Sequence, residues 1–151
     1  LKPSGFEDAT TIVLVRHAEA LSDEDNPGLS EAGFARADRL AELVFPMDIQ
    51  EVFMTSLRRT IFTARPLASK YSLPVSTYTP EQYDRVLTKI FTVRSGKNVM
   101  IYGHSNTTPD LVNKITGNTN LDNIPHDQYD NIFVVTSKGE GAESVVYKFK
   151  F

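Results

Sequence analysis

Short apolar runs alternate with longer amphipathic segments along the whole chain. Residues 11–15, Thr-Ile-Val-Leu-Val, are apolar without alternation, which is typical of a strand buried on both faces of a sheet. Similar runs predict further strands at residues 51–54, 73–78, 98–102, 132–136 and 144–149. The last two runs are joined across Gly139-Glu140-Gly141, so we expect them to form a β-hairpin.

Helical periodicity fills most of the stretches between these strands. Apolar side chains recur from Phe34 to Val44, with Ser30 placed to cap the helix and Pro46 to end it. Further helices are predicted at residues 57–71, from a capping box at Thr79–Gln82, and from a cap at Thr107 or Thr108 to Gly117. Pro66 lies inside the first of these and should kink it or weaken it.

This alternation predicts an α/β fold with three layers, α/β/α. Right-handed crossovers between strands produce a mostly parallel central sheet with helices on both sides, and the last hairpin supplies an antiparallel edge. With 151 residues the chain fits one domain, residues 1–151, in which residues 1–10 form an irregular lead-in. Ligands of such sheets bind beyond the carboxyl ends of the strands, so the residues that follow each strand are the candidates for chemistry.

Composition narrows the classes of function. The chain has 16 Lys and Arg against 19 Asp and Glu, and this acidic balance argues against a nucleic-acid partner. The absence of cysteine excludes disulfides, thiolate nucleophiles and cysteine-based zinc sites. No apolar run approaches the roughly 20 residues of a membrane span. The start at Leu1 suggests a removed signal peptide or a trimmed tail, so both a cytoplasmic and a periplasmic location stay open. The sequence does not indicate the oligomeric state.

Arginine and histidine gather where three of the predicted strands end. The first strand runs into Arg16 and His17, the second leads to Arg58 and Arg59 at the start of a helix, and a later one leads to His104. Guanidinium donors and helix N-termini both suit phosphate oxygens, so we expect a phosphoryl group to bind here. Nearby cations lower the pKa of a histidine, which leaves a neutral imidazole able to attack phosphorus and form a phosphohistidine.

Each of these motifs has a structural interpretation when it stands alone. An Arg-His pair is often a surface loop, Gly103-His104-Ser105 is compatible with a core histidine, and two arginines at a helix start often face solvent. Their occurrence together at successive strand ends favours a site. Asn106 could donate to a phosphate oxygen or act as a plain turn residue, and both interpretations stay open.

A metal site is not expected. His126 with Asp127 and Asp130 has no further nitrogen or sulfur ligand in reach, so a solvated loop is the better interpretation. The chemistry proposed for the arginine and histidine cluster needs no metal and no cofactor.

Four motifs together resemble the histidine phosphatase superfamily, also called phosphoglycerate-mutase-like. They are residues 11–19, 29–33, 59–64 and 102–105. The short chain is most similar to the compact bacterial phosphohistidine-phosphatase branch. The resemblance implies a metal-independent phosphatase that acts on a phosphomonoester or a phosphohistidine, on a small molecule or a protein. It makes His17 the nucleophile and assigns Arg16, Arg59 and His104 to the phosphate pocket.

Arg59 rather than Arg58 matches the family pattern, because the family's pocket arginine stands five positions before the alanine of a Thr-Ala pair, here Ala64. Ala18 replaces the usual glycine after the Arg-His pair. Two alternatives remain: a cofactor-dependent phosphoglycerate mutase, for which the chain is short, and a phospho-ligand binding module that does not turn over.

The resemblance does not assign the general acid. Larger members of the family carry an acid on a long insertion, and that stretch is brief here. Glu81 and Asp84 lie in the corresponding segment, but the better interpretation of both is as carboxylates in the first turn of a helix. Glu19, two residues after His17, is the preferred candidate to orient a histidine or donate a proton.

Overall fold

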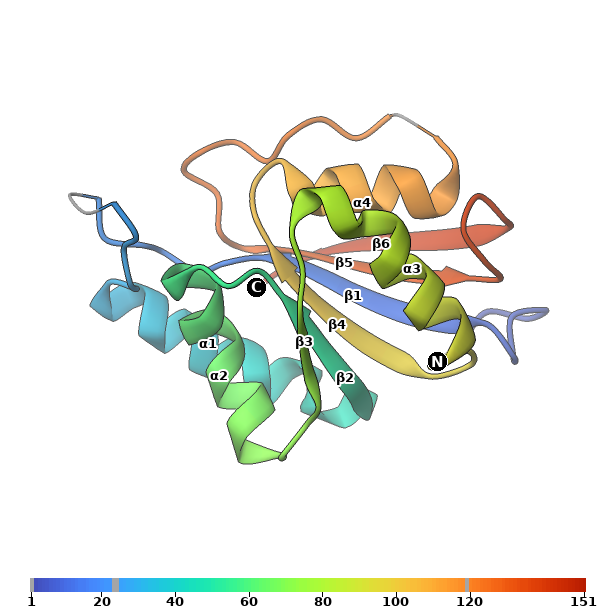
Figure 1. Cartoon of the computed structure of the whole chain (residues 1–151), viewed down its shortest axis with the longest axis horizontal. Helices are drawn as coiled ribbons and strands as arrows, with labels where there is room; N and C mark the ends of the chain where they lie inside the picture. The colour runs from blue at the N-terminus through green and yellow to red at the C-terminus, as the bar shows by residue number, and fades with distance from the viewer. Residues whose placement is uncertain (1, 23–24, 119) are drawn as a thin grey trace.

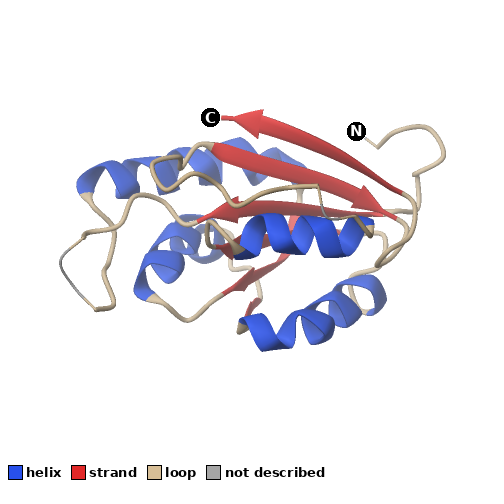
Figure 2. Cartoon of the chain, turned by 90° about the horizontal axis from the view of Figure 1, so that it is seen from above, coloured by secondary structure: helices blue, strands red, loops and turns tan. Residues whose placement is uncertain are grey.

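The computed structural model describes residues 2–22, 25–118 and 120–151. Within these residues a single sheet has the strand order β3-β2-β4-β1-β5-β6. The strands are β1 (Thr10–Arg16), β2 (Ile49–Met54), β3 (Val75–Thr77), β4 (Asn98–Gly103), β5 (Asn131–Ser137) and β6 (Ser144–Lys150). The first four run parallel, whereas β5 is antiparallel to β1 and β6 to β5. The hairpin forms one edge of the sheet (Figure 2), so the predicted α/β fold is confirmed.

Helices cover both faces of the sheet. They are α1 (Glu31–Val44), α2 (Arg58–Lys70), α3 (Tyr83–Thr92) and α4 (Thr107–Thr116). Figure 1 shows α1 and α2 on one side of the sheet and α3 and α4 on the other. None of the helices among the described residues has the length and apolar character needed to cross a bilayer.

Strand β1 shows why an unbroken apolar run was the right signal. Ile12 and Leu14 pack into the core cluster that includes side chains of α3 and α4. Val13 and Val15 point the other way, into the cluster that includes side chains of α1 and α2. Because successive side chains of a strand face opposite sides, a strand covered on both faces needs apolar residues at every position.

The cap of α1 is as predicted, but its first apolar residue is not. Ser30 Oγ accepts a hydrogen bond from the backbone N–H of Gly33 at 3.1 Å, as an N-cap does. Phe34 is 47% exposed, and instead of joining the core its ring lies 5.8 Å from that of Phe62 on α2. In α2, Pro66 lies inside the helix, which continues to Lys70.

The predicted cap of α4 is wrong. Thr107 and Thr108 both lie inside the helix, and Asn106 is the N-cap residue. Thr107 Oγ1 accepts from the N–H of His104, three residues earlier, at 2.9 Å, and Thr108 Oγ1 donates to the carbonyl of Val15 in β1 at 3.2 Å.

The capping box of Thr79 and Gln82 is present, but the turn that it caps is a 3₁₀ turn, Pro80–Gln82. The α-helix begins only at Tyr83.

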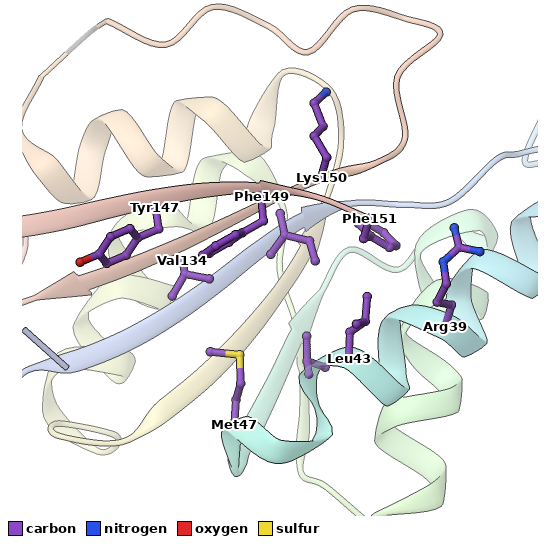
Figure 3. Close-up of a pocket in the computed structure, with 10 residues that line it drawn as sticks. Arg39, Leu43, Met47, Val134, Tyr147, Phe149, Lys150 and Phe151 are labelled. Atoms are coloured by element: carbon purple, nitrogen blue, oxygen red, sulfur yellow. The ribbon is translucent and has the colours of Figure 1, made fainter. Parts of the chain in front are cut away.

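An apolar groove of about 760 Å³ lies between α1 and the β5–β6 hairpin (Figure 3). Leu43 and Met47 line it from the helix side, and Val134, Tyr147 and Phe149 from the sheet. It holds none of the candidate site residues, which lie beyond the carboxyl ends of β1, β2 and β4.

Candidate active site

His17 follows the last residue of β1 and is almost fully buried, with 6% of its surface exposed. Its backbone N–H donates to the Gly103 carbonyl at the end of β4, at 2.8 Å. The Nδ1 atom lies 2.7 Å from the carbonyl oxygen of Ala18. Because a carbonyl can only accept, Nδ1 carries the proton in this contact, and the lone pair of the neutral imidazole is on Nε2.

His104 lies beside it, with the two ring centres 5.3 Å apart in an edge-to-face arrangement. Its Nε2 atom is 2.9 Å from the hydroxyl of Thr55, which follows β2. That hydroxyl donates its single proton to Thr60 Oγ1 at 2.8 Å. Thr55 therefore accepts from His104, and the proton of this second imidazole is on Nε2.

Arg16 is held by the irregular segment before β5. Its Nη1 atom donates to three backbone carbonyls, those of Pro125, His126 and Gln128, at 3.3, 2.9 and 2.7 Å. The guanidinium carbon lies 4.0 Å from the centre of the Tyr129 ring. The Nε atom is buried and has no hydrogen-bond partner among the described residues. A buried donor without a partner is costly, so this N–H is suited to an anionic ligand.

Burial and nearby cations keep both imidazoles neutral. The pKa of His17 falls to about 3, mainly because the ring is desolvated and further because His104, Arg16 and Arg59 repel a positive charge. Burial, followed by the charges of Arg59 and Arg16, lowers the pKa of His104 to about 4. At neutral pH both rings are uncharged, which a nitrogen nucleophile requires.

A cavity of about 500 Å³ opens beside these rings. It brings together four of the predicted site residues, His17, Arg59, His104 and Asn106, from the ends of three strands. Arg16 lies next to them, since its charge acts on both histidines. The rest of the lining consists of Thr55, Ser56, Leu57, Tyr78, Thr79, Pro80, Ser105 and Thr107.

Glu19 is not among the residues that line this cavity. Its carboxylate forms a two-point ion pair with Arg36 of α1, at 2.7 and 3.1 Å. Partial burial would raise the pKa of Glu19, but the hydrogen bonds from Arg36 and from its own backbone N–H, together with the charges of Arg36 and Arg39, hold the pKa below the usual value. The structure therefore does not place Glu19 as the proton donor that the sequence suggested.

The two other acids are also committed elsewhere. Asp84 pairs with Lys114 at 2.9 Å. Hydrogen bonds from its own backbone N–H and from Thr79 lower the pKa of the exposed Glu81. Both therefore fit the interpretation as carboxylates of a helix start.

The loop around His126 makes contacts within the protein and does not form a metal site among the described residues. The His126 backbone carbonyl accepts from Arg16, and Asp130 pairs with Lys150 at 3.2 Å. Over the described ranges, no group of three or more His, Asp or Glu side chains is placed to hold a metal ion.

Two features of the site were not predicted from the sequence. They are the buried threonines that form hydrogen bonds within it and the ring of Tyr129 that packs on Arg16. Thr60 and Thr63 are 0% and 1% exposed although α2 is amphipathic. Two threonines three residues apart on the apolar face of a helix were a usable signal, since buried hydroxyls need partners. Tyr129 carried no comparable signal, because its position depends on the path of an irregular segment.

The chain is similar to known phosphatases in part of its sequence and in its fold. Residues 12–80 match the sequence model of the histidine phosphatase superfamily (branch 1). A candidate phosphohistidine phosphatase, SixA of Nakamurella multipartitia, is 20% identical with a TM-score of 0.68, over 97% of this chain and 96% of that one. A mycobacterial glucosyl-3-phosphoglycerate phosphatase is 12% identical with a TM-score of 0.76, over 94% and 99%. The alpha-ribazole phosphatase from Shigella flexneri is 15% identical with a TM-score of 0.64, over 87% and 96%.

At these identities the structural likeness shows a shared fold. A search of curated protein sequences finds no match. The family match rests on the segment that carries Arg16, His17 and Arg59, and the fold extends over nearly the whole chain. The chain thus resembles the histidine phosphatase superfamily, branch 1, in sequence over residues 12–80, and it shares the fold of solved phosphatases over nearly its whole length.

Proposed function

We propose that this protein is a phosphatase that hydrolyses a phosphomonoester or a phosphohistidine through a phosphohistidine intermediate on His17, without a metal ion. The observation that carries the proposal is the state of His17. Its ring is buried and neutral, its Nδ1 proton is held by the Ala18 carbonyl, and its Nε2 lone pair is left for attack.

In the first step the Nε2 atom of His17 attacks phosphorus, and the bond from phosphorus to the leaving group breaks. In the second step a water molecule attacks the phosphorus, the P–N bond breaks, and phosphate leaves with the neutral imidazole restored. Phosphoryl transfer needs mainly in-line positioning and charge stabilisation. The unpartnered Nε–H of Arg16, the guanidinium of Arg59 and the amide of Asn106 supply donors for the phosphoryl oxygens.

His104 gains a proton when the phosphoryl group binds. Its Nε2 proton is already held by Thr55, and Nδ1 has no hydrogen-bond partner among the described residues. An adjacent dianion favours the charged form of an imidazole and so raises its pKa from about 4. A protonated Nδ1 then adds another charge-assisted donor to the transition state.

The positions of the acidic residues support a substrate with a good leaving group. No Asp or Glu lines the cavity within the described part of the chain, so a strongly basic alkoxide leaving group would depart without a carboxylic acid to protonate it. Phosphohistidine and aryl phosphates have better leaving groups and suit this site. The name of the Nakamurella relative, a candidate phosphohistidine phosphatase, points the same way. The partner would be a small phosphorylated molecule or a protein with phosphohistidine.

The test is hydrolysis of para-nitrophenyl phosphate with a chelator present throughout. We expect turnover that the chelator leaves unchanged and that vanadate inhibits, as a mimic of five-coordinate phosphorus. A strict requirement for added magnesium would contradict metal independence. Failure to hydrolyse both the aryl phosphate and a phosphohistidine substrate would contradict the proposed activity.

A further inference from the structure

Three buried threonines connect the two histidines to the helix that carries Arg59. Thr60 and Thr63 lie in the first two turns of α2, and Thr55 lies just before that helix. All three are buried, with 6% exposure or less. Buried hydroxyls are almost always hydrogen-bonded, and the partners of these three all lead to the candidate site.

Thr63 joins the His17 segment to α2. Its Oγ1 atom accepts from the backbone N–H of Ala18 at 2.9 Å and donates to the backbone carbonyl of Arg59 at 2.7 Å. Ala18 also provides the carbonyl that takes the Nδ1 proton of His17. One hydroxyl therefore ties the residue that orients the His17 ring to the backbone of Arg59.

Thr55 and Thr60 do the same for His104. The chain of hydrogen bonds runs from His104 Nε2 to Thr55 Oγ1 at 2.9 Å and from Thr55 to Thr60 Oγ1 at 2.8 Å. Thr55 has one proton and gives it to Thr60, so it is an acceptor toward the imidazole. This fixes the proton of His104 on Nε2 and leaves Nδ1 unprotonated.

We infer that Thr63 and the Thr55–Thr60 pair are positioning residues. They set the register of the two imidazoles relative to Arg59 and select opposite tautomers, Nδ1–H in His17 and Nε2–H in His104. The kinetic consequence rests on the proposed function, because misplacing a nucleophile by a fraction of an ångström slows transfer. The tautomers are a property of the free protein and can be measured without turnover.

The kinetic test compares Thr63→Val, which keeps the shape and removes both hydrogen bonds, with Thr63→Ser, which keeps the hydroxyl. We expect Thr63→Val to lower kcat about tenfold or more with little change in KM, and Thr63→Ser to recover most of that loss. The matched control is Thr116→Val in α4. Thr116 Oγ1 donates to the Val112 carbonyl at 2.9 Å, the same bond to the residue four positions earlier, away from the site. It should leave kcat unchanged.

The spectroscopic test uses protein labelled with ¹⁵N in its histidines, of which the chain has three. We expect wild-type His17 to show a protonated Nδ1 and His104 a protonated Nε2. Thr63→Val should give His17 a mixture of tautomers and leave His104 unchanged. Thr55→Val should disturb His104 alone, which provides an independent arm if Thr63→Val does not fold. His126, exposed on its loop, should not change in either variant.

The outcomes separate the two proposals. A variant that loses kcat while the histidine tautomers stay as in the wild type would overturn the inference, and so would variants with wild-type tautomers and wild-type kcat. If wild-type protein shows no turnover but the tautomers respond as described, the positioning inference stands and the proposed function fails.

Discussion

At the scale of single residues, the site depends on two imidazoles kept neutral next to two guanidinium groups. Burial and these cations lower the pKa of His17 to about 3 and that of His104 to about 4. The two guanidinium groups supply hydrogen-bond donors, and in the proposed mechanism the imidazole of His104 adds another once it is protonated. The pocket is thus repulsive for a proton while it is empty and attractive for one when a phosphoryl group is bound.

Arg59 and Arg58 provide a matched pair of substitutions. Arg59 lines the cavity, whereas Arg58 donates to the Asn26 carbonyl at 3.4 Å and lies 5.5 Å from the Phe62 ring. Removing a partner of transition-state charge costs several kcal/mol, so Arg59→Ala should lower kcat/KM by about a hundredfold or more. Arg58→Ala should stay within about threefold of wild type, because a surface charge contributes little. Equal losses in steady-state kinetics would mean that the assignment is wrong.

Glu19→Gln tests whether Glu19 acts as an acid. Because Glu19 is paired with Arg36, the substitution should leave the dependence of log kcat/KM on leaving-group pKa unchanged. It should lower stability by about 1 kcal/mol in chemical denaturation, through the weakened pair. Glu81→Gln serves as the comparison, since Glu81 is fully exposed. A selective loss with alkyl esters in either variant would show that its carboxylate is the proton donor after all.

Most of the residues predicted to form the phosphate site come from short motifs at strand ends, which is why the sequence could indicate that they lie together. His17, Arg59 and His104 each follow a recognisable apolar run. The threonines that orient them lie in the same segment as Arg59, whereas the partner of Glu19 comes from elsewhere in the chain. The pairing of Glu19 with Arg36, 17 residues later, depends on how α1 crosses the loop after β1, and no local pattern encodes that crossing.

At the scale of elements, α1 is fitted closely to the segment that follows β1. Gly33 is buried in the first turn of α1, and the Ser30 N–H donates to the Glu19 carbonyl at 2.9 Å. A Cβ atom on Gly33 would collide with the same carbonyl oxygen. The glycine therefore allows the helix to approach the backbone two residues beyond His17.

Gly33→Ala should destabilise the protein even though alanine favours helices. Overpacking of a tight contact typically costs about 1–3 kcal/mol, which outweighs the gain of about 1 kcal/mol in helix propensity. Thermal unfolding should show a lower Tm for Gly33→Ala, while Ala35→Ser, one added atom on the exposed side of α1, should stay close to wild type. A raised Tm for Gly33→Ala would show that the close approach is not maintained in solution.

Strands were predicted better than helix ends. The strands are defined by short local runs rich in apolar residues, and all six appear with boundaries shifted by only a few residues. The predicted start of α4 is wrong because Thr107 and Thr108 resemble N-cap residues in the sequence, but their hydroxyls form hydrogen bonds with His104 and Val15 instead. The prediction that Phe34 joins the core is wrong because helical periodicity shows which face of a helix is apolar, but not how much of that face the rest of the protein covers.

At the scale of the whole molecule, β1 lies in the middle of one sheet, between β4 and β5. Segments from both ends of the sequence therefore complete the same core, and we propose that the chain unfolds as a single domain. The buried neutral histidines then make its stability depend on pH.

The unfolded chain binds protons on histidine near pH 6.5, whereas folded His17 does so only near pH 3. Between these values the unfolded state holds more protons, so the free energy of unfolding falls as the pH is lowered from 6.5 toward 3. From pH 7 to pH 5 the loss from His17 is roughly 2 kcal/mol. Urea titrations at the two pH values should show it, and His17→Gln should reduce it. Equal wild-type stability at both pH values would contradict the assignment.

The most direct test of the proposed function is to trap the intermediate. Rapid acid-free quenching after mixing with a ³²P-labelled aryl phosphate should give a covalent adduct that is stable to base and labile to acid, and peptide mapping should locate it on His17. His17→Ala should give no adduct, and His126→Ala, on the exposed loop, should label as wild type does. Label on a serine, a threonine or an aspartate, or turnover by His17→Ala at the wild-type rate, would contradict transfer through His17.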